Sequence, residues 1–189
     1  MENNITLHKT FGHLKTVLVH KYWVFHYACK LGIPWRGLVH DLSKFSPTEF
    51  WESVRYWDGK SSPIPKCKAD KGYSLAWQHH KGRNPHHYEY WVDYLDQGGK
   101  PIKMPWKDVL ELTADYLGAG RAYQGKKFTL QGEYEWFRHK LSSENPKMHL
   151  HVKYIVEHMF YLFQRDENYL KHFGKYVEYF QGMYEKMTD

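Results

Sequence analysis

Residues 7–29 carry two apolar stripes, and both follow the period of an α-helix. Each stripe steps by three and four residues, which places its members on one helical face. The first stripe is Leu7, Phe11, Leu14, Leu18, Tyr22, Phe25 and Cys29, and the second is His13, Val17, His20, Val24 and Ala28. A helix that is apolar on two faces is typically covered on several sides. The sequence therefore predicts a central helix that ends at Gly32 and Pro34.

Helical patterns continue through most of the chain. Ser46, Pro47 and Glu49 form a capping box with a proline at the first helical position, so a helix is expected to begin there. Gly118 and Gly120 either end a helix or allow a close approach to it. Further helices are expected at 35–45, 46–57, 73–81, 85–94, 106–117 and 133–143, and from Pro146 to the C-terminus with a break near 165–167. Loops are expected at 58–72, 96–104 and 124–132.

These patterns predict an all-α fold in a single domain, residues 1–189, because no internal repeat and no clear strand pattern interrupts them. The 16 Tyr, 10 Phe and 8 Trp residues supply large side chains for helix–helix interfaces. We expect a core at about 5–125 and a C-terminal helical extension at about 133–189. The aromatic extension either covers the core or forms a homodimer.

Charge and cysteine content narrow the classes of partner. The net charge of +6 fits either simple solubility or an anionic ligand. The basic residues are scattered, which does not favour nucleic acid as the partner. Cys29 and Cys67 fit no disulfide or zinc-finger pattern, so a reducing cytoplasm is the expected location. No secretory signal is visible, and no apolar run reaches the roughly 20 residues that a membrane helix needs.

The stretch GLVHDLSKF, residues 37–45, places His40 and Asp41 among apolar residues. A buried carboxylate is costly unless it is paired or bound to a metal. His20 lies on a stripe of the first helix, and Asp115 lies in the apolar stretch LELTADYLGAG. Imidazole and carboxylate are good ligands for Mn, Fe, Co, Ni or Zn. These four residues are therefore predicted to bind a divalent transition metal.

A histidine-rich segment, HHKGRNPHH at residues 79–87, offers ligands for a second ion that Asp41 would bridge. One ligand is expected from His79 or His80, with no preference between them. A second is expected from the next pair, with His86 preferred to His87. The alternative for every one of these histidines, taken alone, is an ordinary core or surface position. The sequence leaves one ion or two open.

The combination of His20, the adjacent His40 and Asp41, and the distant Asp115 resembles the signature of the HD-domain superfamily. HDLSK resembles that superfamily's HDxxK, and Lys44 is the matching lysine. A closer likeness, through IPWRGLVHDLSKFSPTEF and HHKGRNPHH, is to the uncharacterised bacterial and phage family DUF5662. This likeness covers roughly residues 10–125. The DUF5662 likeness brings no established activity, whereas the HD-domain resemblance implies an HD-like helical bundle with additional C-terminal helices.

Several cations could bind a phosphate group on the substrate. Lys44 and Arg36 each lie one helical turn from the His40–Asp41 pair, Arg83 lies between the histidine pairs, and Arg121 follows two glycines. Arginine binds phosphate oxygens with two parallel bonds, whereas lysine acts as a point charge. For each of them a solvated surface position is the alternative. Glu111, one turn before Asp115, is expected either to support the ligands or to be an ordinary exposed residue.

The resemblance implies a metal-dependent phosphohydrolase acting on a phosphate monoester or diester, with a nucleotide as the expected small substrate. A metal ion would generate hydroxide from bound water at neutral pH, and Asp41 and Lys44 are the residues expected to act in catalysis. Two alternatives are an HD-type di-iron oxygenase, which would use six His and Asp ligands, and a non-catalytic binding module stabilised by its metal.

Overall fold

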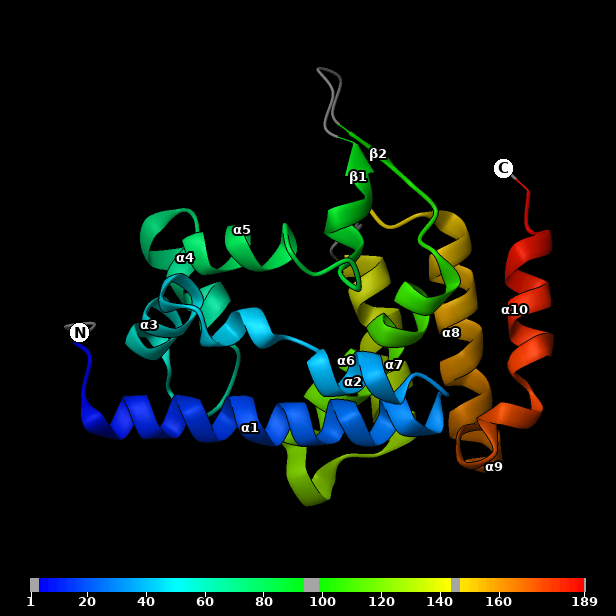
Figure 1. Ribbon diagram of the computed structural model, residues 1–189, viewed down its shortest axis with the longest axis horizontal. Coiled ribbons are helices and arrows are strands. Elements are labelled where there is room, and N and C mark those ends of the chain that lie inside the picture. The colour runs from blue at the N-terminus through cyan, green and yellow to red at the C-terminus, as the bar shows by residue number, and fades with distance from the viewer. Residues whose placement is uncertain (1–3, 94–98, 144–146, 189) are drawn as a thin grey trace.

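The computed structural model describes residues 4–93, 99–143 and 147–188. Helix α1 (Leu7–Lys30) runs along one edge of the molecule, and most other elements lie on one side of it (Figure 1). The stripe from His13 to Ala28 is buried, as predicted. The other stripe is open to solvent: Leu7 is 77%, Phe11 65% and Tyr22 61% exposed. The prediction of a helix covered on several sides was therefore wrong, since only one of its apolar faces is packed.

Helix α6 (Trp106–Gln124) packs against the buried face of α1. A Cβ atom at Gly118 would lie 2.8 Å from the backbone nitrogen of Val24, so only glycine permits this contact. Gly118 and Gly120 thus serve a close approach, which was one of the two predicted roles. They do not end the helix, which continues beyond the predicted residue 117.

The predicted helix at 35–45 is broken in the structure. Helix α2 (Pro34–Val39) ends before His40, and a 3₁₀ turn, η1 (Leu42–Phe45), follows Asp41. Asp41 has a φ of 55°, the left-handed conformation that aspartate tolerates better than most residues. This reversal turns the side chains of His40 and Asp41 toward the same interior space. Sequence alone placed both residues on a continuous helix, which was wrong.

Helix α3 (Pro47–Tyr56) begins as predicted, with the Ser46 hydroxyl accepting a hydrogen bond from the backbone of Glu49. A short helix, α4 (Pro63–Lys71), occupies most of the predicted loop at 58–72. Ser62 caps it and Pro63 is its first residue, a start signal that the surrounding lysines and prolines obscured. Helix α5 (Leu75–Lys81) then follows within the predicted range.

The described residues 85–93 contain no α-helix, contrary to the prediction of a helix at 85–94. The chain instead forms a 3₁₀ turn, η2 (Tyr88–Trp91), and the Trp91 indole donates a hydrogen bond to the Pro85 carbonyl. Two short antiparallel strands come next, β1 (Val92–Asp93) and β2 (Lys100–Pro101). Residues 94–98, which include parts of the predicted helix and loop, lie outside the described residues.

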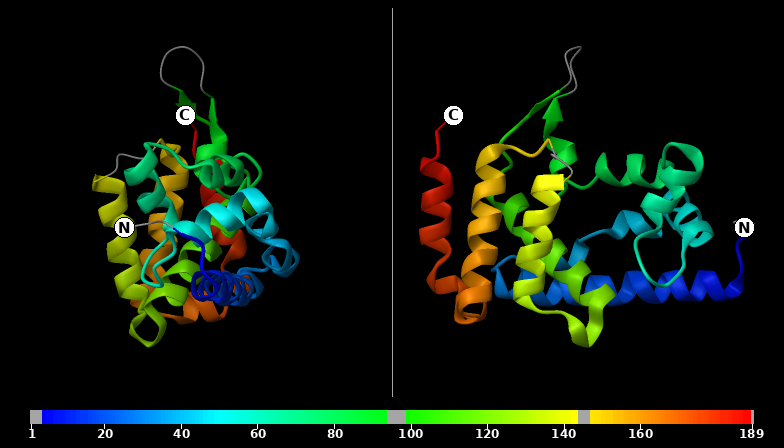
Figure 2. Two further views of the ribbon diagram at one scale, coloured as in Figure 1. Left: turned by 90° about the vertical axis from the view of Figure 1, so that its left-hand side faces the viewer. Right: turned by 180° about the vertical axis from the view of Figure 1, so that it is seen from behind.

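The C-terminal part adds helices whose shared interior is aromatic. Viewed from behind, α7 (Leu130–Ser143), α8 (Leu150–Arg165) and α10 (Val177–Lys186) stand side by side (Figure 2). The break predicted near 165–167 is confirmed, because α8 ends at Arg165, whereas Pro146 lies outside the described residues. The elements are η3 (Gly125–Lys127), α7 (Leu130–Ser143), α8 (Leu150–Arg165), α9 (Asn168–Lys171), η4 (Phe173–Lys175) and α10 (Val177–Lys186). The all-α prediction is confirmed, and no helix in the described parts has the length and hydrophobicity needed to span a membrane.

Candidate metal centre

Asp41 lies at the middle of a buried group of imidazoles and is 1% exposed. Its two carboxylate oxygens face different pairs of histidines. Oδ2 lies 3.3 Å from Nε2 of His20 and 3.1 Å from Nε2 of His40. Oδ1 lies 3.3 Å from Nε2 of His80 and 3.4 Å from Nε2 of His86. A single carboxylate therefore connects α1, the break after α2, α5 and the turn that follows α5.

Asp115, on α6, completes the first half of this group. Its Oδ1 lies 3.2 Å from Nε2 of His20 and 3.4 Å from Nε2 of His40. One ligand atom from each of these residues and Asp41 lies within 4.8 Å of all the others. Atoms that bind one ion at about 2.1 Å lie about 3.0–3.4 Å apart at octahedral or tetrahedral angles. The observed separations match that spacing.

The second half contains Asp41, His80, His86 and His87, whose ligand atoms also lie within 4.8 Å of one another. The rings of His86 and His87 are 4.3 Å apart between centroids, and His87 is 4.7 Å from His80. Burial, followed by the neighbouring charges of His86 and His80, lowers the pKa of His87 well below its ordinary value. A neutral imidazole is the form that binds metals. His86 and His87 therefore both reach the second half of the group.

The atoms that face this interior space lack hydrogen-bond partners among the described residues. They include Nε2 of His20, His40 and His86 and Oδ1 of Asp41, whereas Oδ2 of Asp41 pairs with the Lys44 ammonium. Buried polar atoms without partners are rare and costly, so each calls for an explanation. Nitrogen and carboxylate atoms that converge without bonding to one another are what a cation would bind. The donor set fits a divalent transition metal.

Two carboxylates outside this group orient its imidazoles. Glu111 Oε1 accepts hydrogen bonds from Nδ1 of His40 at 2.9 Å and of His86 at 3.1 Å. Burial raises the pKa of Glu111, but these hydrogen bonds outweigh it and hold the pKa well below its ordinary value. Because Nδ1 donates outward, Nε2 carries the lone pair that faces inward. Glu111 thus orients the imidazoles of His40 and His86, which is one of the two roles expected for it.

Glu49 contacts both members of the other histidine pair, His79 and His80. Its Oε2 lies 2.7 Å from Nδ1 of His80, and its Oε1 lies 2.6 Å from Nδ1 of His79. Only His80 also reaches Asp41, so His79 supports the group from outside and is not placed among the ligand atoms. Sequence reasoning missed Glu49 because its place in the capping box already explained it. The Ser46 hydroxyl accepts from the backbone N–H of Glu49, while the Glu49 carboxylate is taken up by the two histidines.

Of the four cations predicted to bind phosphate, only Lys44 lies at the site. Its Nζ is 2.5 Å from Oδ2 of Asp41. Arg36 lies behind the site, where its guanidinium binds Asp108 and Oε2 of Glu111. The structure therefore gives Arg36 a supporting position instead of a place against substrate.

Arg121 and Arg83 are not brought to the site. The guanidinium of Arg121 lies 4.9 Å from the centroid of the Trp23 ring and lines a different cavity. Arg83 is exposed on the turn after α5. Helical spacing cannot show which way a long side chain turns, which is why the sequence could not separate these two from Lys44.

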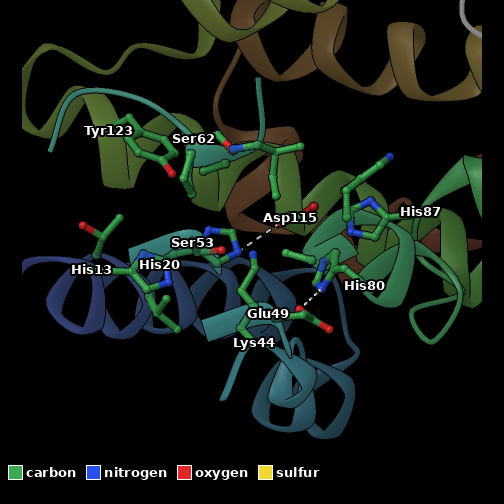
Figure 3. A pocket seen from close by; sticks show the side chains of 17 residues that line it. His13, His20, Lys44, Glu49, Ser53, Ser62, His80, His87, Asp115 and Tyr123 are labelled. Carbon is green, nitrogen blue, oxygen red and sulfur yellow. Dashed lines mark hydrogen bonds and ion pairs between the residues drawn. The ribbon is translucent and has the colours of Figure 1, made fainter. Parts of the chain in front are cut away.

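A cavity of about 210 Å³ leads to the two groups of ligands. Figure 3 shows His20, His80, His87 and Asp115 around it, with Lys44 and Glu49 beneath and Tyr123 and Ser62 above. Its other walls are mainly small or apolar. These are Val17, Pro63, Ile64, Ala76, Trp77 and Ala119. The arrangement is that of a candidate metal centre at the side of a small, largely apolar cavity.

The chain belongs to the family of unknown function DUF5662, which it matches over residues 9–162. This range contains every residue of the two groups of ligands and both supporting carboxylates. A search of curated proteins and a search of solved structures each found no match.

Proposed function

We propose that this protein is a divalent-metal-dependent phosphohydrolase that cleaves a phosphate monoester or diester. The observation that carries the proposal is the buried carboxylate of Asp41, which is shared between two groups of unpaired imidazole nitrogens. The resemblance of His20, His40, Asp41 and Asp115 to the HD-domain signature supports the same reaction and favours a nucleotide as substrate.

The residues fit two ions. His20, His40 and Asp115 would hold one and His80 with His86 or His87 the other, with Asp41 shared. Mixed nitrogen and oxygen donors suit Mn, Fe, Co, Ni or Zn. When bound, such an ion would lower the pKa of its water to about 7 and so supply hydroxide at neutral pH.

The chain itself supplies charge and orientation. Burial lowers the pKa of Lys44, but Asp41 outweighs it and raises the pKa above its ordinary value, so the ammonium stays charged. A fixed cation next to the shared carboxylate stabilises negative charge that develops on phosphoryl oxygens. Glu49 and Glu111 hold the imidazoles in position, and the apolar walls limit the access of water.

Metal content and phosphate release test the proposal together. Protein purified without oxygen and loaded with Mn²⁺ is expected to bind about two ions per chain and to release phosphate from a panel of monoesters and diesters. Lys44→Ala should retain both ions and lose at least about tenfold in turnover. Lys15→Ala, a matched change on the exposed face of α1, should alter neither. Full metal content with no phosphate release from any ester would contradict the proposal.

A second candidate is a di-iron oxygenase of the HD type. The specific observation in its favour is that, among the four predicted cations, only Lys44 lines the cavity, which is a small cationic lining for a phosphate ester. This candidate predicts oxygen consumption and a mixed-valent iron signal in electron paramagnetic resonance, with no phosphate release. The same purified protein loaded with Fe²⁺ separates the two candidates.

A further inference from the structure

The cavity extends well beyond the metal centre along the buried face of α1. His13 and His20 both line it and lie seven residues apart on the same helix. Seven residues of α-helix span about 10 Å. In Figure 3, His13 and Tyr123 lie on one side of the cavity, and His80 and His87 lie on the other. The cavity therefore has a metal end and a distal end, and His13 belongs to the distal end.

His13 has an unmet hydrogen-bonding atom at this distal end. The residue is 6% exposed, and its Nδ1 is buried without a hydrogen-bond partner among the described residues. Its ring packs at 5.3 Å from the ring of Phe50, which fixes its position. Leaving such an atom without a partner is costly, and residues that bind ligands are where that cost is tolerated.

The imidazole of His13 is uncharged at neutral pH. Burial lowers the pKa of His13 to about 4, and the nearby charge of Lys44 contributes. A neutral imidazole offers one donor and one acceptor but no net charge. The distal end therefore suits a polar, uncharged group and offers no charge to bind a second phosphate.

The rest of the cavity limits what can occupy it. Lys44 is the one lysine or arginine among the lining residues, and it lies next to Asp41 at the metal end. The remaining walls include Val17, Ile64 and Trp77. A ligand that fits has one anionic group, a compact apolar body and an uncharged hydrogen-bonding group about 10 Å from the metal end.

We propose that His13 forms a substrate-binding subsite that recognises an uncharged hydrogen-bonding group, such as an amide or hydroxyl, on the organic part of a monophosphate ester. That the anionic group of this ligand is a phosphate rests on the proposed function. The subsite makes the enzyme selective for compact monophosphates with a polar group far from the phosphate.

Two aryl phosphates that differ in one group provide the test. Phenyl phosphate has no hydrogen-bonding group on its ring, whereas 4-acetamidophenyl phosphate carries an amide opposite the phosphate. The wild type is expected to prefer the amide ester by about tenfold in kcat/KM, the effect of one net hydrogen bond. His13→Phe keeps a ring in place and should abolish this preference, while His13→Asn, which retains a donor and an acceptor, should restore part of it.

Further measurements separate a failure of the subsite from a failure of the proposed reaction. Both His13 variants should keep the metal content and melting temperature of the wild type, and inorganic phosphate should inhibit all three proteins equally. Turnover of both esters with the same ratio in wild type and His13→Phe would overturn the subsite and leave the phosphohydrolase intact. If neither ester is hydrolysed, calorimetry decides: tighter binding of the amide ester by the wild type only supports the subsite, and equal binding overturns it.

Discussion

Two regions of this molecule are closed to solvent, but they are built from opposite chemistry. The candidate metal centre buries His40, Asp41 and His86 at 1% exposure each. The interior of the C-terminal helices buries Phe137, Phe160, Phe163, Phe173 and Phe180 at 0–1% exposure. Phe137 and Phe160 meet edge to face at 5.4 Å, a favourable aromatic geometry. The phenylalanine rings pack against one another, whereas the polar atoms of the candidate metal centre face a space that no described side chain fills.

This difference separates what holds the fold together from what is available for binding. Burial of aromatic surface stabilises the fold without any further partner. Burial of unpaired imidazole and carboxylate atoms costs stability until a ligand binds them. Substitutions in the two regions should therefore change different measurements.

The largest effect is expected for Asp41→Asn. Asparagine tolerates the left-handed backbone at this position but lacks the negative charge that both ligand groups share. We expect loss of both ions and of turnover by at least about 1000-fold, measured by elemental analysis and phosphate release. Retention of two ions in a folded variant would show that Asp41 is not the shared ligand.

The next effect distinguishes the members of one histidine pair. His80→Ala removes a nitrogen that faces Asp41, so metal content should fall from about two ions to about one. His79→Ala removes only a contact with Glu49 and is the matched control, with two ions retained and affinity reduced by about tenfold. Equal losses in the two variants would contradict the assignment of His80 as the inward residue.

Phe163→Ala should affect stability alone. Truncating a buried phenylalanine typically costs about 3–5 kcal/mol, because contacts are lost and a cavity remains. Denaturant unfolding should report this loss, while the folded variant binds as many ions as the wild type. A drop in metal content per folded chain would show that the two regions are energetically coupled.

Glu133, on α7, gives the smallest predicted effect. It is 2% exposed, and its Oε2 has no hydrogen-bond partner among the described residues. Burial, with a contribution from Asp115, raises the pKa of Glu133 from its ordinary 4.5 to about 8. The folded state therefore favours the protonated form, and the stability this provides is lost as pH rises from about 4.5 through about 8.

Comparison with Glu133→Gln isolates this contribution. Between pH 6 and pH 8.5 the metal-free wild type should lose about 2–3 kcal/mol more unfolding free energy than the variant, which has no proton to release. Denaturant unfolding at the two pH values measures the difference. Parallel pH dependence in both proteins would show that Glu133 is already ionised when folded.

The sequence predicted the helical class, and the grouping of four candidate ligands, more closely than the local backbone. His20, His40, Asp41 and Asp115 stood out because each lies in an apolar context, and the structure brings them together. The break at Asp41 had no such signal, since residues 37–45 contain no proline and no interior glycine. The left-handed turn depends on contacts with distant helices, which local propensity does not encode.

Side-chain direction was the second source of error. Arg36, Lys44 and Arg121 looked equivalent as cations near the motif, but they turn toward Glu111, Asp41 and the Trp23 ring respectively. The prediction that both apolar stripes of α1 are covered failed for a related reason. Periodicity identifies an apolar face, but it does not tell whether another element covers that face.

The distribution of the candidate ligands along the chain also affects which helices unfold locally. Its ligand atoms extend from His20 on α1 to Asp115 on α6, so they meet only when these two helices are docked. An ion that binds this docked state alone would add free energy to it in proportion to the logarithm of its concentration. Backbone amides of α1 and α6 would then exchange their hydrogens more slowly as metal is added. Those of α10, which supplies no ligand, would keep their own rate.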